Sequence, residues 1–295
     1  MSATLEAVRA RCRFPTRGPV TCAVSGGPDS LALLVLACDA DLDVTAVHVD
    51  HGLRPDGGSE AAVVADAAGR FGAAFRSERA GVRPGGDLEA RARTARRHLL
   101  GPDALYGHTA DDQAETVLLA LLRGSGLDGV AAMRSEHHPL LALRRAETHA
   151  LCAELGLEPV RDPTNDDPRF RRNRVRAEVL PLLDDVADRD VVPLLCRFAG
   201  LARNDVDLLD HLASGLDATD ARALASAPAP LAGRAVRGWL RGLLPGGHPP
   251  DAAAVQRVLA VARGEGAGTE VAGGVRVRRR EQRLRADGPP RRDDR

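Results

Sequence analysis

Residues 25–30, Ser-Gly-Gly-Pro-Asp-Ser, have the types and the spacing that phosphate binding requires. They follow one apolar run, typical of a buried strand, and precede another, typical of a helix. Gly26 and Gly27 allow the backbone to curl until its amides point at one spot, while Ser25 and Ser30 add hydroxyl donors. Because the N-terminus of the following helix adds a partial positive charge, the loop fits a phosphate or a pyrophosphate.

Two further residues refine this expectation. Pro28 suits the first turn of the helix, where a backbone N–H has no partner to lose. Asp29 would repel a bound polyphosphate unless a cation such as Mg²⁺ bridged the two. The chain contains no lysine, so this loop differs from the common phosphate loop, which needs a Lys after its last Gly. An ordinary strand-to-helix turn that holds two glycines is the alternative.

A second candidate group lies in residues 107–116, Gly-His-Thr-Ala-Asp-Asp-Gln-Ala-Glu-Thr. His108, Asp112 and Glu115 are spaced i, i+4 and i+7, so in a helix all three share one face near its N-terminus. Acidic side chains at that end also serve as simple caps, because the helix dipole stabilises them. Asp111, Asp112 and Glu115, with a histidine beside them, are more acidic groups than a helix cap needs. We therefore expect a carboxylate cluster that either holds Mg²⁺ or binds a cationic substrate.

Residues 161–176 hold six arginines and one aromatic residue, Phe170. Guanidinium groups suit phosphate oxygens and an aromatic ring suits base stacking, so the segment has the composition of an RNA contact. An exposed loop whose arginines are balanced by local acids would have the same composition. The formal net charge of +0 gives the whole chain no general attraction to nucleic acid, so any RNA contact must be local.

The apolar pattern predicts the elements that must hold these residues. We expect strands at 20–24, 43–49, 73–76, 104–107 and 158–160, and helices at 31–37, 59–71, 88–100 and 139–155, with a further helix from 108. This alternation favours an α/β fold with a parallel sheet, whose ligands bind at the carboxyl ends of the strands. Beyond residue 183 we expect helices at 191–214, 219–226, 229–244 and 251–263, then an arginine-rich hairpin at 268–285.

Composition narrows the class of protein. With 295 residues, 44% of them apolar, the chain is long enough for two domains with buried cores. No apolar run reaches the roughly 18 residues of a membrane span, and arginines interrupt the N-terminal segment where a secretory signal would lie. The five cysteines are scattered without a C-x-x-C pair. Their pattern favours reduced thiols in a cytoplasmic protein over zinc, iron–sulfur or disulfide sites.

Several motifs in chain order resemble those of a known family. They are SGGPDS at 25–30, VHVDHGLRP at 47–55, ARTAR at 92–96, GHTADDQAET at 107–116 with LLRGSG at 121–126, and DPTN…RFRRNRVR at 162–176. With them the chain resembles the tRNA(Ile)-lysidine synthetases, a branch of the PP-loop ATP pyrophosphatases, closely over residues 18–183 and loosely beyond. The resemblance implies an α/β fold with a Rossmann-like parallel sheet of the PP-loop (adenine nucleotide α-hydrolase) type. A smaller, mainly helical C-terminal domain ending in a short hairpin would follow.

The resemblance also implies a division of labour along the chain. We expect the PP-loop ATP pyrophosphatase domain at 1–213, including an Arg-rich tRNA-contacting segment at 161–183, and a tRNA-binding domain at 214–295. The implied enzyme is a cytoplasmic ligase without a membrane partner, and a homodimer is compatible with it. The tail is short for the family, so the additional C-terminal domain of longer relatives is not expected.

The reaction that the resemblance implies has two steps. The carbonyl oxygen of the wobble cytidine in tRNA(Ile) with a CAU anticodon attacks the α-phosphate of ATP, and pyrophosphate leaves. The ε-amine of free L-lysine then displaces AMP to give lysidine. ATP is thus a co-substrate, with Mg²⁺ at Asp29. The resemblance assigns ATP binding to Ser25, Gly26, Gly27, Pro28, Asp29 and Ser30, catalysis to Asp29, His108, Asp112 and Glu115, lysine binding to Asp112 and Glu115, and tRNA binding to Arg171, Arg172, Arg174 and Arg176.

Some positions depart from the family pattern, and two other classes of function stay open. Ala120 stands where an Arg is usual, Arg97 where a Tyr is usual, and His138 where an Arg is usual. A PP-loop tRNA thiolase would need catalytic or cluster-binding cysteines, and the chain has no paired ones. A non-catalytic nucleotide-binding module would use the carboxylates only as caps. Whether pyrophosphate release requires lysine, sulfur or neither separates the three.

Overall fold

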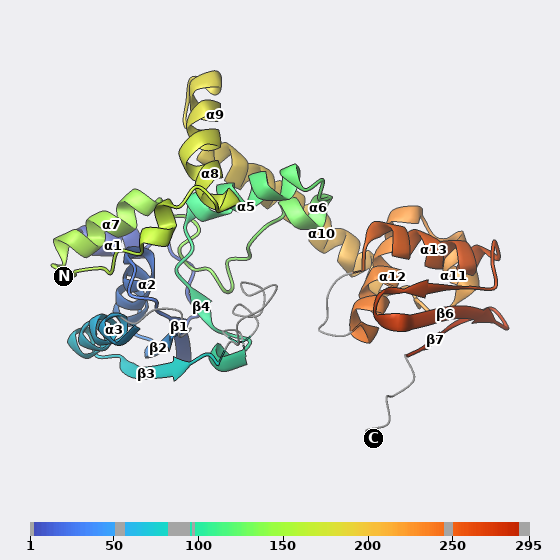
Figure 1. Ribbon diagram of the computed structural model, residues 1–295, viewed down its shortest axis with the longest axis horizontal. Helices are drawn as coiled ribbons and strands as arrows, with labels where there is room; N and C mark the ends of the chain where they lie inside the picture. Colours follow the sequence, from blue (N-terminus) through green and yellow to red (C-terminus); the bar gives the residue numbers. More distant parts are fainter. Residues whose placement is uncertain (1–2, 51–56, 82–94, 96–97, 245–249, 289–295) are drawn as a thin grey trace. The chain divides into compact units, whose positions relative to one another are not determined.

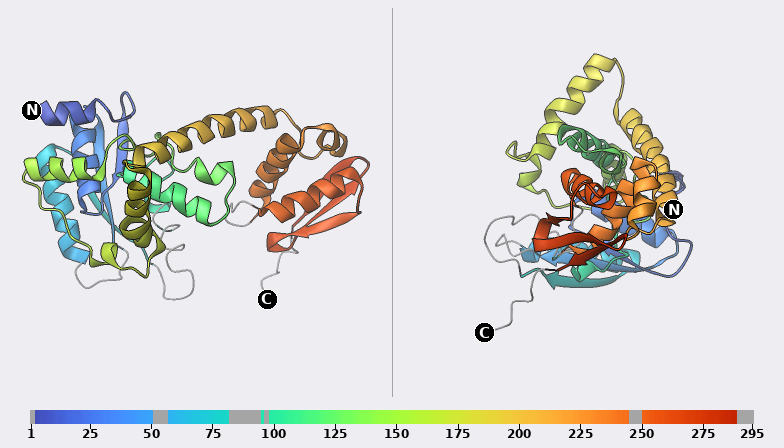
Figure 2. Two further views of the ribbon diagram at one scale, coloured as in Figure 1. Left: turned by 90° about the horizontal axis from the view of Figure 1, so that it is seen from above. Right: turned by 90° about the vertical axis from the view of Figure 1, so that its right-hand side faces the viewer.

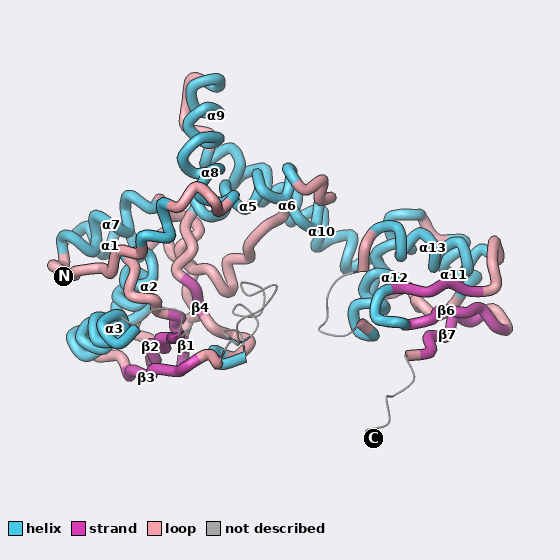
Figure 3. The backbone as a smooth tube through the Cα atoms, in the orientation of Figure 1, coloured by secondary structure: helices cyan, strands magenta, loops and turns pink. Residues whose placement is uncertain are grey.

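The computed structural model describes residues 3–50, 57–81, 95, 98–244 and 250–288. The chain divides into two compact units, residues 1–201 and 202–295. Figure 1 labels the elements along the chain, and Figure 3 shows that each unit combines helices with strands of its own. The boundary between the units falls inside one long helix, α10 (Val192–Ser214).

The first unit is built on a parallel sheet of order β3-β2-β1-β4. Its strands are β1 (Pro19–Ala23), β2 (Asp43–Asp50), β3 (Ala74–Arg79) and β4 (Leu105–Tyr106). The chain runs outward from β1 to β2 and β3, and then places β4 on the other side of β1. This reversal creates a topological switch point between β1 and β4, where open α/β sheets bind ligands. Residues 25–30 follow β1 and residues 107–116 follow β4, so the fold brings both predicted groups to this point.

The helices of the first unit surround this sheet and its central helix, α2. The described helical elements are α1 (Ala3–Arg9), α2 (Pro28–Asp39), α3 (Gly57–Phe71), α5 (Ala110–Leu122), α6 (Leu127–Val130), α7 (Arg145–Glu154), the 3-10 turn η1 (Pro163–Asp166), α8 (Arg171–Arg174), the π-helical turn η2 (Val175–Val179), α9 (Leu180–Ala187) and the first part of α10. Residues 30–37 of α2 are all buried, because strands cover one side of this helix and α1 and α7 the other (Figure 1). That burial explains the unbroken apolar run in the sequence.

Helices α8, η2 and α9 continue one another over residues 171–187 (Figure 2), and α8 and η2 pack against α5. Ala110 and Ala114 of α5 share an apolar cluster with Val175 and Leu180. A π-helical turn adds a residue to the helical repeat and is frequent at functional sites. The packing brings the arginine-rich segment against the helix that carries Asp112 and Glu115.

The second unit packs helices onto an antiparallel sheet of order β5-β6-β7. Its elements are α11 (Ala221–Ser226), α12 (Ala229–Leu243), α13 (Ala252–Arg263), β5 (Gly268–Val271), the 3-10 turn η4 (Ala272–Gly274), β6 (Val275–Arg280) and β7 (Arg283–Asp287). Val275, Val277 and Leu284 join the apolar cluster of the three helices, whereas Arg276 and Arg278 are exposed. This alternation follows from the period of two in a strand.

The structure confirms the α/β class and most predicted elements, with three differences. Residues 158–160 form no strand; the Val160 amide instead donates a single backbone hydrogen bond to the Gly26 carbonyl (2.9 Å). The helix predicted at 139–155 begins only at Arg145, because turns occupy the residues before it. The predicted hairpin is part of a three-stranded sheet, since β5 also pairs with β6.

Some predictions fall outside the described residues, namely residues 51–55 of the second motif, Arg97, and most of the helix predicted at 88–100 together with its ARTAR motif.

His48 is 2% exposed within β2, and its Nδ1 lies 3.1 Å from the Val24 carbonyl oxygen, so it occupies a core position. Within the described residues, no helix combines the length and apolar character needed to cross a membrane.

Candidate active site

The loop after β1 is closed by its own side chains. The Ser30 hydroxyl donates to the Gly27 carbonyl (2.8 Å) and accepts from the Ser25 amide (3.1 Å). The Ser25 hydroxyl, which is at the surface, lies 3.3 Å from the Ser30 hydroxyl. Gly26 has a φ of +86°, a conformation that favours glycine, and Pro28 occupies the first position of α2 as the sequence predicts. The Ser30 side chain therefore holds the shape of the loop from inside.

Gly107, at the end of β4, lies directly against this loop. A Cβ atom at position 107 would come within 2.4 Å of the Asp29 carbonyl oxygen, closer than any real contact of that kind. Only glycine therefore allows the ends of β1 and β4 to approach this closely. The contact fixes the position of His108, the next residue, relative to the loop.

Asp29 is held by α7, a helix that the sequence did not indicate as part of the site. The Thr148 hydroxyl donates to Oδ1 of Asp29, and Nε of Arg145 lies 3.7 Å from its Oδ2. Leu151 and Cys152 of the same helix are buried in the core beside α2, which fixes both groups in place. Burial raises the pKa of Asp29 above its ordinary value, although the Thr148 hydrogen bond opposes the effect.

Asp112 is both a helix cap and a member of a charge cluster. Its Oδ2 accepts hydrogen bonds from the amide (2.9 Å) and hydroxyl (3.0 Å) of Thr109, the residue that precedes α5. Its Oδ1 accepts from Arg145 (3.0 Å) and Arg172 (3.1 Å). Burial alone would raise the pKa of Asp112, but these two guanidinium groups and His108 lower it to about 2. The two interpretations of this residue as cap and as site residue are therefore compatible.

Glu115 is fully buried, and three arginines converge on it. Its Oε1 accepts from Arg145 (3.1 Å) and Arg176 (2.7 Å), and its Oε2 from Arg172 (2.6 Å) and Arg176 (3.2 Å). These arginines come from α7, α8 and η2. With the two aspartates described above, the cluster sets three carboxylates against three guanidinium groups, so its charges balance.

The four arginines expected to bind tRNA divide into two pairs. Arg172 and Arg176, four residues apart, reach inward to the carboxylates. Arg171 and Arg174 are exposed; Arg174 pairs with Glu178 (2.7 Å), and Arg171 has no ion pair within the described part of the chain. The segment thus offers one pair to the surface and uses the other to organise the site.

His108 lies beside His138, one of the positions that depart from the family pattern. Their Nδ1 atoms are 3.0 Å apart, and their ring centroids are separated by 4.7 Å at an interplanar angle of 74°. Ala120, another such position, is buried in α5, where its Cβ is among the nearest neighbours of Gly129. The departure at His138 therefore lies within the site.

Two residues of α7 were not predicted from the sequence: Arg145, which links Asp29 to the carboxylates of α5, and Thr148, which donates to Asp29. Their i, i+3 spacing on a helix was a signal, but it also suits an ordinary exposed face. Asp111 has a different role from its neighbour: it accepts hydrogen bonds from the Arg144 side chain (3.0 Å) and the Arg145 amide (2.7 Å). It therefore braces the start of α7 rather than joining the cluster.

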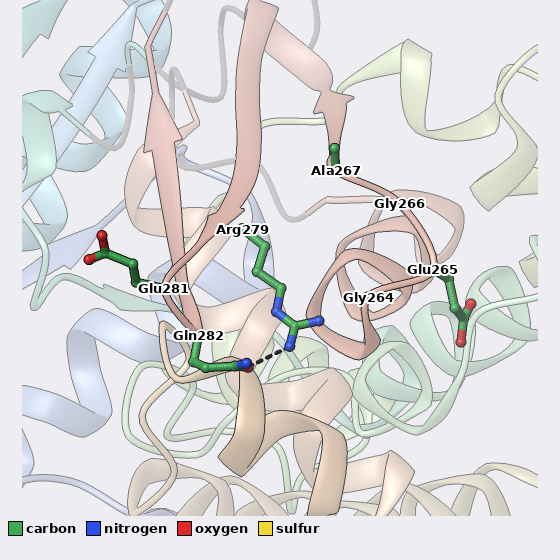
Figure 4. A pocket seen from close by; sticks show the side chains of 7 residues that line it. All are labelled: Gly264, Glu265, Gly266, Ala267, Arg279, Glu281 and Gln282. Atoms are coloured by element: carbon green, nitrogen blue, oxygen red, sulfur yellow. Dashed lines mark hydrogen bonds between the residues drawn. The ribbon is translucent and has the colours of Figure 1, made fainter.

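A separate hollow of about 510 Å³ lies in the second unit (Figure 4). Its lining comes from the turn after α13 and the turn between β6 and β7, and consists of Gly264, Glu265, Gly266, Ala267, Arg279, Glu281 and Gln282. In Figure 4 the Arg279 side chain crosses toward Gly264 and donates to Gln282, while Glu265 and Glu281 point away. Because neither glutamate points into the hollow, the candidate active site remains the one between β1 and β4.

Comparison with known proteins gives two matching families. Residues 5–183 match the PP-loop domain, and residues 220–285 match the TilS substrate binding domain. A tRNA(Ile)-lysidine synthase from Nocardia farcinica is 46% identical over 87% of this chain and 86% of the relative. The chain belongs to the tRNA(Ile)-lysidine synthase family. A member from Salinispora tropica is 40% identical over 98% of this chain and 97% of the relative, so the family likeness covers both units.

The fold of the synthase family is shared with a more distant protein. The U34-tRNA thiolase NcsA from Methanococcus maripaludis has a TM-score of 0.54 and 16% identity, covering 68% of this chain and 78% of that chain. At this identity the likeness concerns the fold alone. The family assignment therefore rests on the synthases.

Proposed function

We propose that this chain is a ligase that joins free L-lysine to the wobble cytidine of tRNA(Ile) with a CAU anticodon. The reaction consumes ATP, passes through an adenylated cytidine, and releases AMP and pyrophosphate. The observation that supports it best is the meeting of two groups at the switch point of the sheet. The SGGPDS loop and the carboxylates of α5 lie there together, in a chain whose relatives are named tRNA(Ile)-lysidine synthase.

In the first step, residues 25–30 would bind the phosphates of ATP. The amides of Gly26 and Gly27, the Ser25 hydroxyl and the N-terminus of α2 supply donors for the departing pyrophosphate. Asp29 would hold Mg²⁺ together with the phosphates, and the ion would neutralise part of their charge. No group of three or more metal-binding side chains occurs among the described residues, which fits an ion that takes most of its ligands from the nucleotide and water.

In the second step, the ammonium group of lysine would bind at Asp112 and Glu115. Both carboxylates already pair with guanidinium groups, so the ammonium would replace one of these cations rather than join them. We expect the ammonium to bind at Oδ1 of Asp112. Arg145 and Arg172 both donate to this oxygen, so the ammonium can replace one of them while the other stays bound. An ammonium group donates three hydrogen bonds and is favoured by ionised acceptors.

The tRNA would contact the arginines of α8 and η2 and the second unit. We propose that four arginines bind phosphates of the anticodon loop. The exposed pair, Arg171 and Arg174, would bind phosphates directly. The inner pair, Arg172 and Arg176, would bind where the RNA chain approaches the carboxylates. We propose a PP-loop ATP pyrophosphatase domain at 1–213, with its tRNA-contacting segment at 161–183, and a tRNA-binding domain at 214–295. The match of 220–285 to a substrate binding domain supports this division. We also propose a cytoplasmic location and a homodimer. Light scattering would measure the mass of the dimer.

The state of the cysteines favours the lysine reaction over a thiolase reaction. Burial raises the pKa of Cys12 and Cys22 to about 12, and that of Cys38, Cys152 and Cys196 to about 11. Sulfur chemistry needs the thiolate, which such thiols do not provide near neutral pH.

Pyrophosphate release from ATP tests the proposal. We expect release that requires the CAU-anticodon tRNA and turns over repeatedly only when L-lysine is present. Release that needs a sulfur donor would favour a thiolase, and no release under any of these conditions would favour a non-catalytic module.

A further inference from the structure

The pair formed by His108 and His138 is placed by the backbone on both sides. His108 follows Gly107, whose close contact with Asp29 fixes it, and precedes Thr109, where α5 is capped. The turn that carries His138 is tied to β4 by the Tyr106 amide, which donates to the His137 carbonyl (2.9 Å). The Nδ1 atoms are consequently held 3.0 Å apart, within hydrogen-bonding distance.

A bond between two Nδ1 atoms contains a single proton. A neutral imidazole has one N–H and one bare nitrogen, so the ring that donates from Nδ1 keeps its lone pair on Nε2. The ring that accepts at Nδ1 carries its proton on Nε2. If both rings were protonated, two N–H groups and two positive charges would face each other and the bond would be lost. The intact pair therefore takes up at most one additional proton.

The surroundings decide which ring becomes charged. The groups near His108 include Tyr106 of β4, His138 of the following turn, Asp112 of α5 and, beyond Asp112, Arg145 of α7 and Arg172 of α8. The Asp112 carboxylate stays ionised and interacts electrostatically with His108, which contributes to its lowered pKa. A positive charge on the pair is thus favoured on His108, with His138 as the acceptor of its Nδ1 proton.

We propose that His138 is a positioning residue that accepts the Nδ1 proton of His108 and so leaves Nε2 of His108 as a base. This inference rests on the proposed function, in which the lysine ammonium binds beside Asp112. A proton passes from the ammonium nitrogen to Nε2, and the freed electron pair forms the C–N bond to the adenylated cytidine. The C–O bond to AMP breaks, and AMP leaves with its electron pair. The charge gained by His108 strengthens its hydrogen bond to His138.

Three variants of the turn test the assignment. His138→Leu removes the acceptor at similar volume, His138→Asn keeps an acceptor near the position of Nδ1, and His137→Leu makes the same chemical change at the neighbouring residue. Lysine incorporation and pyrophosphate release are measured for each over a range of pH. We expect His138→Leu to slow lysine incorporation by roughly ten- to a hundredfold, since general-base catalysis contributes about 10²–10⁴-fold in total. Release of the first equivalent of pyrophosphate, which precedes the lysine step, should change little.

The pH profile separates positioning from a merely structural effect. Without the acceptor, the charged form of His108 loses a hydrogen bond, so the acid limb of lysine incorporation should move to lower pH as the plateau falls. His138→Asn should recover most of the rate, and His137→Leu should match the parent protein. Equal rates and equal pH profiles for His138→Leu and the parent protein would overturn the proposal.

The protonation of the pair is also measurable without activity. Nitrogen-15 spectra of the histidine rings should show His108 protonated at Nδ1 and bare at Nε2 in the parent protein near neutral pH. A proton on Nε2 instead would overturn the proposal. If the parent protein incorporates no lysine, the proposed function fails, while these spectra still decide how the two rings share their proton.

Discussion

Glu115 is a buried carboxylate with a structural role in the protein and a proposed role in its chemistry. It lies among three arginines from separate elements, and all of its acceptor capacity is in use. Removing one partner of a buried ion pair costs about 3–5 kcal/mol, because the other charges remain buried. The same residue that we expect to bind lysine therefore also anchors α8 and η2 on α5.

Glu115→Gln separates these roles. The amide keeps the volume and an acceptor oxygen but loses the charge, so adenylated tRNA should still form with release of pyrophosphate. Its conversion to lysidine should slow about tenfold to a hundredfold, as expected for a hydrogen bond to a charged group worth about 1.5–3 kcal/mol. Glu178→Gln, which removes an exposed carboxylate, is the matched control. Loss of pyrophosphate release in folded Glu115→Gln would assign the carboxylate to ATP or Mg²⁺ instead of lysine.

Asp112 gives a pH dependence of stability. Its pKa of about 2 in the folded protein lies below the ordinary 3.8, so its ionised form favours folding above pH 3.8. This contribution, about 2 kcal/mol, is lost as the pH falls through about 2. The difference in unfolding free energy between the parent protein and Asp112→Asn should shrink by that amount between pH 5 and pH 2 in urea titrations. An equal difference at both pH values would show that the guanidinium groups do not stabilise the charge.

At the scale of elements, the candidate site depends on the close approach of β4 to the loop after β1. Gly107→Ala would place a methyl group against the Asp29 carbonyl, where backbone must move. We expect ATP affinity to fall at least tenfold and unfolding free energy to fall by about 1–3 kcal/mol, as for other overpacked sites. Gly69→Ala in α3 is the control, because a Cβ there meets nothing within 4 Å. ATP affinity equal to that of the control would mean that the strand ends do not need this contact.

The exposed arginines of α8 make a separate prediction about RNA. Each lost phosphate contact should reduce the slope of log affinity against log salt by roughly one unit. Arg171→Ala with Arg174→Ala should therefore flatten the salt dependence of tRNA binding by about two units, measured by filter binding. Arg17→Ala, at an exposed position before β1, should leave the slope unchanged. If the double variant keeps the parent slope, the RNA contacts lie elsewhere.

The elements that the sequence predicted well are those with a local signature. The unbroken apolar run of α2 and the spacing of His108, Asp112 and Glu115 each depend on residues that are near in sequence. Residues 158–160 have a similar local pattern, yet they form one hydrogen bond to Gly26 and no ladder. A strand at 158–160 would need a neighbouring strand to pair with, and the local sequence pattern does not show whether one is present.

The composition of the charge cluster was not predictable in the same way. Arg145 lies thirty residues beyond Glu115, and its contact with Asp29 joins α7 to α2. Its position follows from the packing of Leu151 and Cys152 in the core. The arginines at 172 and 176 were identified, but only the packing of η2 on α5 shows that they face inward.

At the scale of the whole molecule, we propose that ATP and lysine bind to the first unit and that tRNA binds to surfaces of both units. The matches at 5–183 and 220–285 cover the two units in turn. A single reaction that requires all three substrates would therefore engage the entire chain.

Transfer of labelled L-lysine to tRNA tests this central claim most directly. The protein is incubated with ATP, Mg²⁺, labelled lysine and a tRNA(Ile) transcript with a CAU anticodon, and a transcript with uridine at the wobble position is the control. The account predicts label on the first transcript only, in equal amount to the AMP and pyrophosphate released. Pyrophosphate release without label on the tRNA, or equal labelling of both transcripts, would contradict it.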